Sequence, residues 1–213
     1  MTVFFTSDNH FSHKNIRNFC PSTRQGADHH EMNRIMIQKW QSQVQQHDTV
    51  YMLGDVFFCS ASDAISLIKQ LPGEKHLIFG NHDKVIRSNS ELRSHFASTA
   101  EWRQIHLPVP GAIPQVRIID GGRGMDTRIT VQKVILHHYP TYEWKDMQKG
   151  AFHLYGHIHS RYGETQHPGI DGRCMDVGID SRPNMDMTLW TWEEVYRILS
   201  KRQVRAHHGK VFE

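Results

Sequence analysis

The chain has 213 residues, of which 38% are apolar and 22% charged, and its net charge is +3 at neutral pH. This composition is that of an ordinary globular protein, and we expect one domain over residues 1–213, with a basic tail after about residue 200. A charge of +3 does not by itself indicate a nucleic-acid-binding protein.

The three cysteines, Cys20, Cys59 and Cys174, share no C-x-x-C spacing. This argues against a disulfide framework or a cysteine-based zinc site and favours a reducing compartment. The apolar run Val3–Phe5 is too short for a signal peptide, and no stretch approaches the roughly 20 apolar residues that a membrane span needs. We therefore expect a cytoplasmic protein without a membrane partner.

One local pattern recurs along the chain. A short run rich in β-branched and aromatic residues stops abruptly at Asp, Asn or His. It occurs at residues 2–10, 49–57, 75–83, 133–140 and 152–159. Runs of this length bounded by glycine or polar residues predict buried strands. Ligands bind beyond the carboxyl ends of strands in open α/β sheets, so the pattern predicts one shared binding edge.

Helices are predicted between and after these strands. Residues 28–46 have apolar side chains at helical spacing, and Asp28 with Glu31 forms a capping-box start. A second helix is predicted over 62–71 and a last one from Thr191. The stretch 113–136 predicts two strands around a Gly-rich hairpin-like connection. The order of elements over the first 80 residues indicates βαβ units in a mixed α/β fold.

The strand ends supply a set of metal-capable side chains. Each one alone is weak, since an Asp after a strand is usually a turn or capping residue. Their recurrence at all five strand ends makes them candidate ligands, namely Asp8, His10, Asp55, Asn81, His138, His157 and His159. The spacing of two between His157 and His159 is close enough for a pair, but a chain with 17 histidines contains close pairs by chance.

Counting donors favours two metal ions over one. Seven side chains are too many for a single first-row ion, whereas a bridging carboxylate would give four contacts per ion and leave room for water. Mixed imidazole, carboxylate and amide donors favour Mn, Fe, Zn, Co or Ni over Mg or Ca, and Mn is the ion we expect.

The ordered segments "SDNH", "LGDV", "GNHD", "HYP" and "GHIH" resemble the five signature blocks of the calcineurin-like metallophosphoesterases. The flanking text is similar to a small bacterial and phage subgroup of that family. The resemblance covers nearly the whole chain, less well over 110–130 and after about 200. It implies a βαβ sandwich of two mixed β-sheets flanked by α-helices. It also implies a phosphoesterase that hydrolyses a phosphomonoester or phosphodiester through a metal-bridging hydroxide.

The resemblance also implies how the ligands divide. Asp8, His10 and His159 would hold the first ion, and Asn81, His138 and His157 the second, with Asp55 bridging both. His137 is adjacent to His138, but the family ligand is the histidine of H-x-P, which selects His138. Along a strand, His137 would point to the opposite face.

Further residues are assigned weaker roles. By the family motif, His82 is the expected catalytic group, either as an electrostatic stabiliser or as the general acid that protonates the leaving alkoxide, and Asp83 could orient its imidazole. The alternative for His82 is a turn cap. His13 and Arg17 are candidates for contact with a substrate phosphate, and their alternative is a solvated loop. Arg161 and Arg182 are weaker candidates of the same kind.

The expected partner is a small phosphorylated substrate, for which a nucleotide is one candidate. The alternative function is a nuclease of the same fold acting on DNA or RNA, although 213 residues leave little room for the extended basic groove that it would need. A non-enzymatic metal-binding scaffold is disfavoured, since every ligand position is retained. The sequence does not indicate the oligomeric state.

Overall fold

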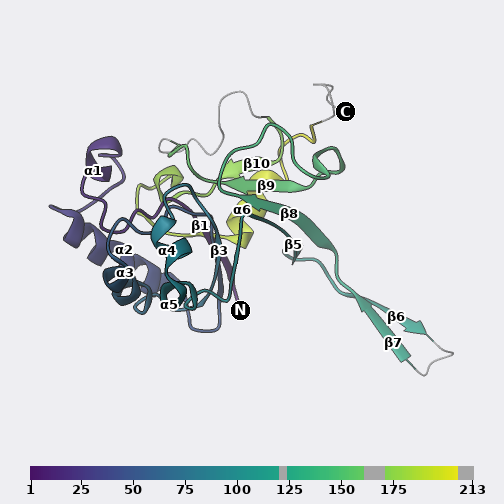
Figure 1. Cartoon of the computed structure of the whole chain (residues 1–213). Helices are drawn as coiled ribbons and strands as arrows, with labels where there is room; N and C mark the ends of the chain where they lie inside the picture. Colours follow the sequence, from purple (N-terminus) through teal and green to yellow (C-terminus); the bar gives the residue numbers. More distant parts are fainter. Residues whose placement is uncertain (120–123, 161–170, 206–213) are drawn as a thin grey trace.

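The computed structural model describes residues 1–119, 124–160 and 171–205. Arg161 and the end of the basic tail, 206–213, therefore lie outside the described residues. Two sheets form the body of the molecule, and a two-stranded hairpin projects away from it (Figure 1).

The first sheet has five strands in the order β11-β1-β2-β3-β4. Strands β1 to β4 run parallel and β11 pairs antiparallel with β1. The bounds are Val3–Thr6 for β1, Thr49–Met52 for β2, Glu74–Ile78 for β3, Ser98–Ala100 for β4 and Trp190–Thr191 for β11. The predicted βαβ units over the first 80 residues are thereby confirmed.

The second sheet has four strands in the order β10-β9-β8-β5, with β5 antiparallel to β8 and the others parallel. The bounds are Trp102–Pro108 for β5, Val131–His137 for β8, Phe152–Tyr155 for β9 and Cys174–Asp176 for β10. The predicted hairpin is present as β6 (Gln115–Ile119) and β7 (Gly124–Arg128). The five predicted strands therefore divide between two sheets, three in the first and two in the second. The sequence had not indicated β5.

Helices α1 to α5 gather on one side of the first sheet (Figure 1). Their bounds are Ile16–Phe19 for α1, His29–Gln43 for α2, Ala61–Ile68 for α3, Lys84–Ser88 for α4 and Ser90–Arg93 for α5. The sixth helix, α6, spans Trp192–Leu199, and 3-10 turns occur at Met147–Lys149 and Ile179–Ser181. None of the helices in the described ranges combines the length and apolar character that a membrane crossing requires.

Local capping explains where the predicted helices begin. Thr191 accepts from the Glu194 amide while Glu194 accepts from the Thr191 amide, so the capping box of α6 is confirmed. Asp28 caps α2 by accepting from the amides of His30 and Glu31. Glu31 reaches one residue further back than expected, to the amide of Ala27.

Strand alternation divides the core into layers. On β8, Val134 and Leu136 face a cluster shared with Phe5 of the first sheet and with α6, whereas Ile135 packs on the outer side with Trp144. A separate cluster lies between the first sheet and helices α2 and α3. The two sheets thus pack face to face, which confirms the expectation of two mixed sheets flanked by helices.

The inter-sheet layer should be the main source of stability. Leu136 is fully buried in it, so Leu136→Ala should lower the free energy of unfolding by about 2–5 kcal/mol. Val131, on the same strand, is 50% exposed, and Val131→Ala should change the free energy of unfolding by less than about 0.5 kcal/mol. Urea unfolding followed by circular dichroism measures both, and equal losses would contradict this layer assignment.

Candidate metal centre

The seven predicted ligands all follow strands of the two packed sheets. Asp8 and His10 follow β1, Asp55 follows β2 and Asn81 follows β3. His138 follows β8 of the second sheet, and His157 and His159 follow β9. The carboxyl ends of parallel strands meet at one edge, which brings together side chains far apart in the sequence, such as Asp8 and His157, which are 149 residues apart.

The backbone leaves the strands in an uncommon conformation. Five of the seven residues have φ in the left-handed region: 53° for Asp8, 50° for His10, 55° for Asp55, 72° for His157 and 46° for His159. Residues other than glycine seldom adopt this region, although Asp, Asn and His do so more often than others. Such conformations cluster at functional sites, where the surrounding contacts hold them.

Two glycines allow the strand ends to approach closely. A Cβ atom at Gly156 would lie 1.9 Å from Ser7 Oγ and 2.4 Å from Asp8 Oδ2. In its absence the amide of His157 donates to Asp8 Oδ2 over 2.8 Å. Gly54 has φ +94°, and a Cβ there would lie 2.7 Å from Nδ1 of His138. The main chains at the ends of the two sheets can therefore approach closely.

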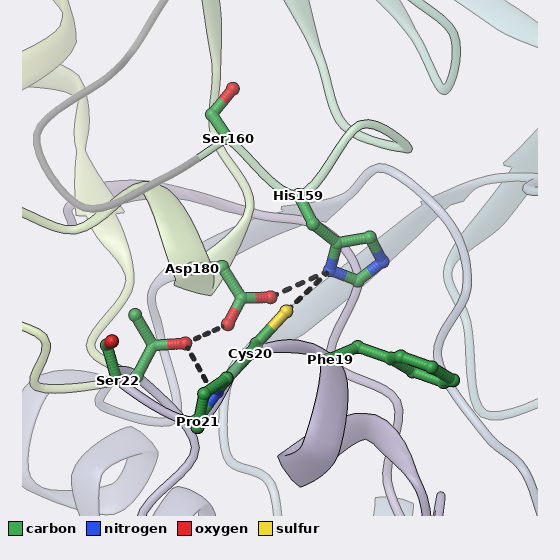
Figure 2. A pocket seen from close by; sticks show the side chains of 8 residues that line it. Phe19, Cys20, Pro21, Ser22, His159, Ser160 and Asp180 are labelled. Atoms are coloured by element: carbon green, nitrogen blue, oxygen red, sulfur yellow. Dashed lines mark hydrogen bonds and ion pairs between the residues drawn. The ribbon is translucent and has the colours of Figure 1, made fainter.

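A cavity of about 400 Å³ opens beside this edge, and His159 lies at its inner end (Figure 2). Nδ1 of His159 donates to Oδ2 of Asp180 over 2.8 Å. This bond fixes the ring and leaves Nε2 as the nitrogen that can bind a metal, as second-layer carboxylates do in many metal sites. Sequence reasoning did not single out Asp180.

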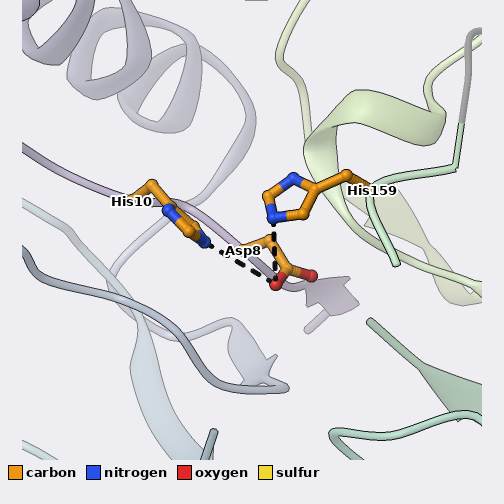
Figure 3. Close-up of side chains that lie close together, drawn as sticks. All are labelled: Asp8, His10 and His159. Atoms are coloured by element: carbon orange, nitrogen blue, oxygen red, sulfur yellow. Dashed lines mark ion pairs between the residues drawn. The ribbon is translucent and has the colours of Figure 1, made fainter. Parts of the chain in front are cut away.

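The other side of the His159 ring faces Asp8 (Figure 3). Asp8 Oδ1 lies 3.8 Å from Nε2 of His159 and 3.8 Å from Nε2 of His10. Each residue of this first group offers one ligand atom within 4.8 Å of the other two. Asp8 Oδ1 and both ring nitrogens of His10 are buried without a hydrogen-bond partner. Buried polar atoms are rarely left in this state, and a cation between them would satisfy all three residues.

A second group consists of Asp55, His138 and His157, whose ligand atoms also lie within 4.8 Å of one another. Asn81 Oδ1 joins it, 2.9 Å from Nε2 of His138 and 3.1 Å from Nδ1 of His157. Nδ1 of His138 donates to the carbonyl of Leu53 over 2.6 Å, which directs its Nε2 toward the group. The asparagine thus belongs to the same donor set as the carboxylate and the imidazoles.

Asp55 lies between the two groups. Its Oδ2 is 3.9 Å from Nε2 of His10 and 3.5 Å from Nε2 of His138, while its Oδ1 accepts from the amide of His82. The carboxylate is almost fully buried. One side chain can therefore serve both groups, which is the arrangement that a shared carboxylate requires.

The electrostatics of Asp8 and His10 suit metal binding, whereas His159 must first lose a proton. Burial would lower the pKa of His159, but its hydrogen bond to Asp180 and the charge of Asp8 outweigh this and raise it to about 11. Burial lowers the pKa of His10 to about 4 despite the opposing carboxylate of Asp8, so its imidazole is neutral at pH 7. Burial would raise the pKa of Asp8, but the nearby imidazole of His10 and the charge of His159 outweigh this and keep the pKa well below its ordinary value. A neutral imidazole and an ionised carboxylate are the forms that bind metals.

A buried ion pair joins the two chain segments of the first group. The guanidinium of Arg24 donates to both carboxylate oxygens of Asp180, at 2.9 and 2.6 Å. It also donates to the carbonyl of Asp8 at 2.6 Å and to that of Asn9 at 2.8 Å. Arg24 thereby ties the left-handed segment after β1 to the carboxylate that holds His159. In the sequence, Arg24 has no feature that sets it apart from the other residues of the loop after the first strand.

The predicted catalytic pair separates into two roles. His82 is exposed, and its ring lies 5.0 Å from the ring of Phe58 and 6.3 Å from that of His10. Asp83 is buried and accepts from the amides of Asp55, Val56 and Gly80 at 2.7–3.0 Å. We had expected Asp83 to orient the His82 imidazole; its hydrogen bonds instead hold the ends of β2 and β3 together. His82 is the residue that stands beside the ligand groups.

Of the described residues proposed for contact with a substrate phosphate, one lies beside the ligand groups and the others are engaged elsewhere. The ring of His13 lies 5.3 Å from that of His10, at the edge of the first group. Arg17 donates to the carbonyl of Ala27 and Arg182 to the carboxylate of Glu194, so both guanidinium groups have protein partners. His137 donates to the carbonyl of Tyr139 and lines a different cavity, with Trp102 and Trp144.

The comparisons with known proteins identify relatives. No family model matches the chain. It is 30% identical over 196 residues to the Gene 66 protein of Mycobacterium phage L5, which covers 84% of this chain and 86% of that protein. The chain belongs to the Gene 66 protein family. The Gene 66 protein of Mycobacterium phage D29 is 28% identical over 195 residues, covering 84% of this chain and 88% of that protein.

Two further similarities extend beyond the phage Gene 66 proteins. An uncharacterized protein of Methanocaldococcus jannaschii is 39% identical over 84 residues, which make up 38% of this chain and 47% of that protein. A crystallised protein of unknown function from Aquifex aeolicus superposes with a TM-score of 0.59 at 20% identity, covering 92% of this chain and 98% of that one. At that identity the similarity shows a shared fold and nothing of the activity of this chain.

The Arg24–Asp180 pair should be a major local contributor to stability. Its side chains are 0% and 3% exposed, so Arg24→Met leaves a buried carboxylate without its cation and should cost about 3–5 kcal/mol. Arg87 pairs with Glu101 with side chains 41% and 65% exposed, and Arg87→Met should cost about 0–1 kcal/mol. Chemical denaturation of both variants tests this, and similar small losses would refute it.

Proposed function

We propose that the protein is a dinuclear metal-dependent phosphoesterase that hydrolyses a phosphomonoester or a phosphodiester. The observation that carries the proposal is the pair of adjacent ligand groups with Asp55 between them, 3.9 Å from His10 Nε2 and 3.5 Å from His138 Nε2. The resemblance of the five strand-end segments to the calcineurin-like metallophosphoesterases adds independent support. A mononuclear or structural site would need no shared carboxylate.

The donor atoms fit two divalent ions. The first would be held by Asp8, His10 and His159, the second by Asn81, His138 and His157, and Asp55 would contribute to both. Such an ion would provide a partner for the buried Oδ1 of Asp8 and for one of the two unpartnered ring nitrogens of His10. The mixture of nitrogen and oxygen donors fits a first-row transition metal, of which Mn, Fe, Zn, Ni and Co are candidates. When bound, the ions would supply Lewis acidity to the phosphoryl oxygens and activate water.

The protein itself would position the ligands and move the proton. His159 and His138 are each held through Nδ1, by Asp180 and by the Leu53 carbonyl, so their Nε2 atoms are preset for binding. His82 stands at the solvent-facing edge beside Phe58, with its backbone fixed by Asp55 Oδ1. An imidazole there can deliver a proton to the departing alkoxide. We further propose a reducing, cytoplasmic setting, since the three cysteines form no disulfide.

Removal of the shared carboxylate charge tests the dinuclear assignment. Wild-type protein loaded with Mn should retain two ions per chain after gel filtration, and Asp55→Asn should lose most of this metal because both groups lose a ligand. Hydrolysis of bis-p-nitrophenyl phosphate should fall by more than about 100-fold. Asp63→Asn, an exposed change on α3, is the matched control. Metal content and turnover at wild-type levels in Asp55→Asn would refute the dinuclear proposal.

The role of His82 can be separated from metal binding. His82→Ala should keep both ions, because its ring is in neither ligand group, and should lower turnover of a diester with an alkyl leaving group by roughly 100-fold or more. The deficit should shrink with p-nitrophenolate, which needs no proton to depart. His47→Ala, at an exposed histidine remote from both groups, is the control. An equal deficit with both leaving groups would exclude proton donation by His82.

A further inference from the structure

The cavity beside His159 has a lining unlike the ligand groups. Its volume is about 400 Å³, and its outer wall is formed by Phe19, Cys20, Pro21 and Ser22 (Figure 2). His159, Ser160 and Asp180 form the inner end. The space is large enough for an organic group of several atoms rather than for one water molecule.

The outer wall is held in place by the protein interior. The carbonyl of Cys20 accepts from the amides of Thr23 and Arg24 at 3.2 and 3.0 Å, which closes the loop into a compact turn. The Thr23 hydroxyl donates to Asp180, and Arg24 pairs with the same carboxylate. Thr23, Arg24 and Asp180 are all buried. The cavity is therefore pre-formed by the same network that orients His159.

One imidazole separates the cavity from the first ligand group. Nε2 of His159 lies 3.8 Å from Asp8 Oδ1, whereas Nδ1 faces the cavity wall, 3.9 Å from Sγ of Cys20. If a phosphoryl group is bound at the first ligand group, the ester group attached to it can therefore reach the cavity. The neighbouring rings of His13 and Phe19, 6.5 Å apart, continue the apolar surface at its rim.

The lining is unsuited to a second anionic group. Among the described residues that form it there is no lysine or arginine, and the carboxylate of Asp180 already has Arg24 and His159 as partners. What it offers is an aromatic ring, a proline, a thiol and the hydroxyls of Ser22 and Ser160. The Ser160 hydroxyl is buried and has no hydrogen-bond partner. An uncharged group with apolar surface matches these side chains, whereas an added anion would lack a cation.

We propose that this cavity binds an uncharged, partly apolar ester group of the substrate, next to the phosphoryl group at the first ligand group. The inference rests on the proposed function and deepens it: the preferred substrates are phosphoesters with an uncharged aryl or similar organic group. Phosphoesters that carry a further negative charge at that position are disfavoured.

Binding of three phosphonates to the Mn-loaded full chain tests the proposal without requiring turnover. Isothermal titration calorimetry would compare methylphosphonate, phenylphosphonate and 4-carboxyphenylphosphonate. Wild-type protein should bind the phenyl compound at least tenfold more tightly than the methyl compound. The 4-carboxyphenyl compound should bind no more tightly than the methyl compound. Ser22 is exposed and lines the cavity, so Ser22→Trp should fill it and reduce phenyl binding to the level of methyl binding.

The matched control is Ser94→Trp, at an exposed serine after α5, which precedes β4 and so lies at the opposite end of the first sheet. It should behave as wild type, and neither variant should change methylphosphonate affinity more than twofold. Equal affinity for the methyl and phenyl compounds, or tight binding of the carboxyphenyl compound, would overturn the cavity proposal alone. If none of the three binds, the cavity proposal and the metal centre fail together.

Discussion

The candidate centre depends on how closely the ends of β1, β2 and β9 approach one another. Gly156 and Gly54 stand where any side chain would collide with Ser7, Asp8 or His138. Their small size lets backbone amides reach carboxylates of neighbouring strands, as the His157 amide reaches Asp8. The carboxylate of Asp83 completes the arrangement by accepting three amides of the segments after β2 and β3. The segments that carry these ligands are therefore held largely by hydrogen bonds from main-chain amides to buried carboxylates.

This close approach concentrates buried negative charge. Asp8, Asp55, Asp83, Asp176 and Asp180 are all nearly inaccessible to solvent. Burial and the charge of Asp8 together raise the pKa of Asp176 to about 6, which reflects the mutual repulsion. Arg24 and the protonated imidazole of His159 offset part of this charge, and divalent cations could offset more of it. The region is poised to attract divalent ions because the fold gathers more carboxylates there than it neutralises.

The sequence predicted the parts of this centre that follow a local rule. Asp8, His157 and the other ligands each end a short apolar run, and that pattern could be read without the fold. Asp180 and Arg24 follow no such rule, because their importance arises only when residues 156 positions apart form an ion pair. Asp176 ends β10 and fits the same strand-end pattern, but that strand has only three residues and was not recognised. The division into two sheets was likewise set by long-range pairing.

The left-handed backbone at the ligand positions restricts what natural variation could accept there. Asp, Asn and His tolerate this conformation better than most residues, and glycine adopts it freely. A branched residue such as valine at Asp8 or His159 would be disfavoured by the main chain even in a relative that had no use for metals. An Asp or His at such a position would therefore serve two needs, the backbone conformation and, under the proposed function, metal binding. Asn81 and His138, whose φ values are not in this region, would answer more directly to metal binding.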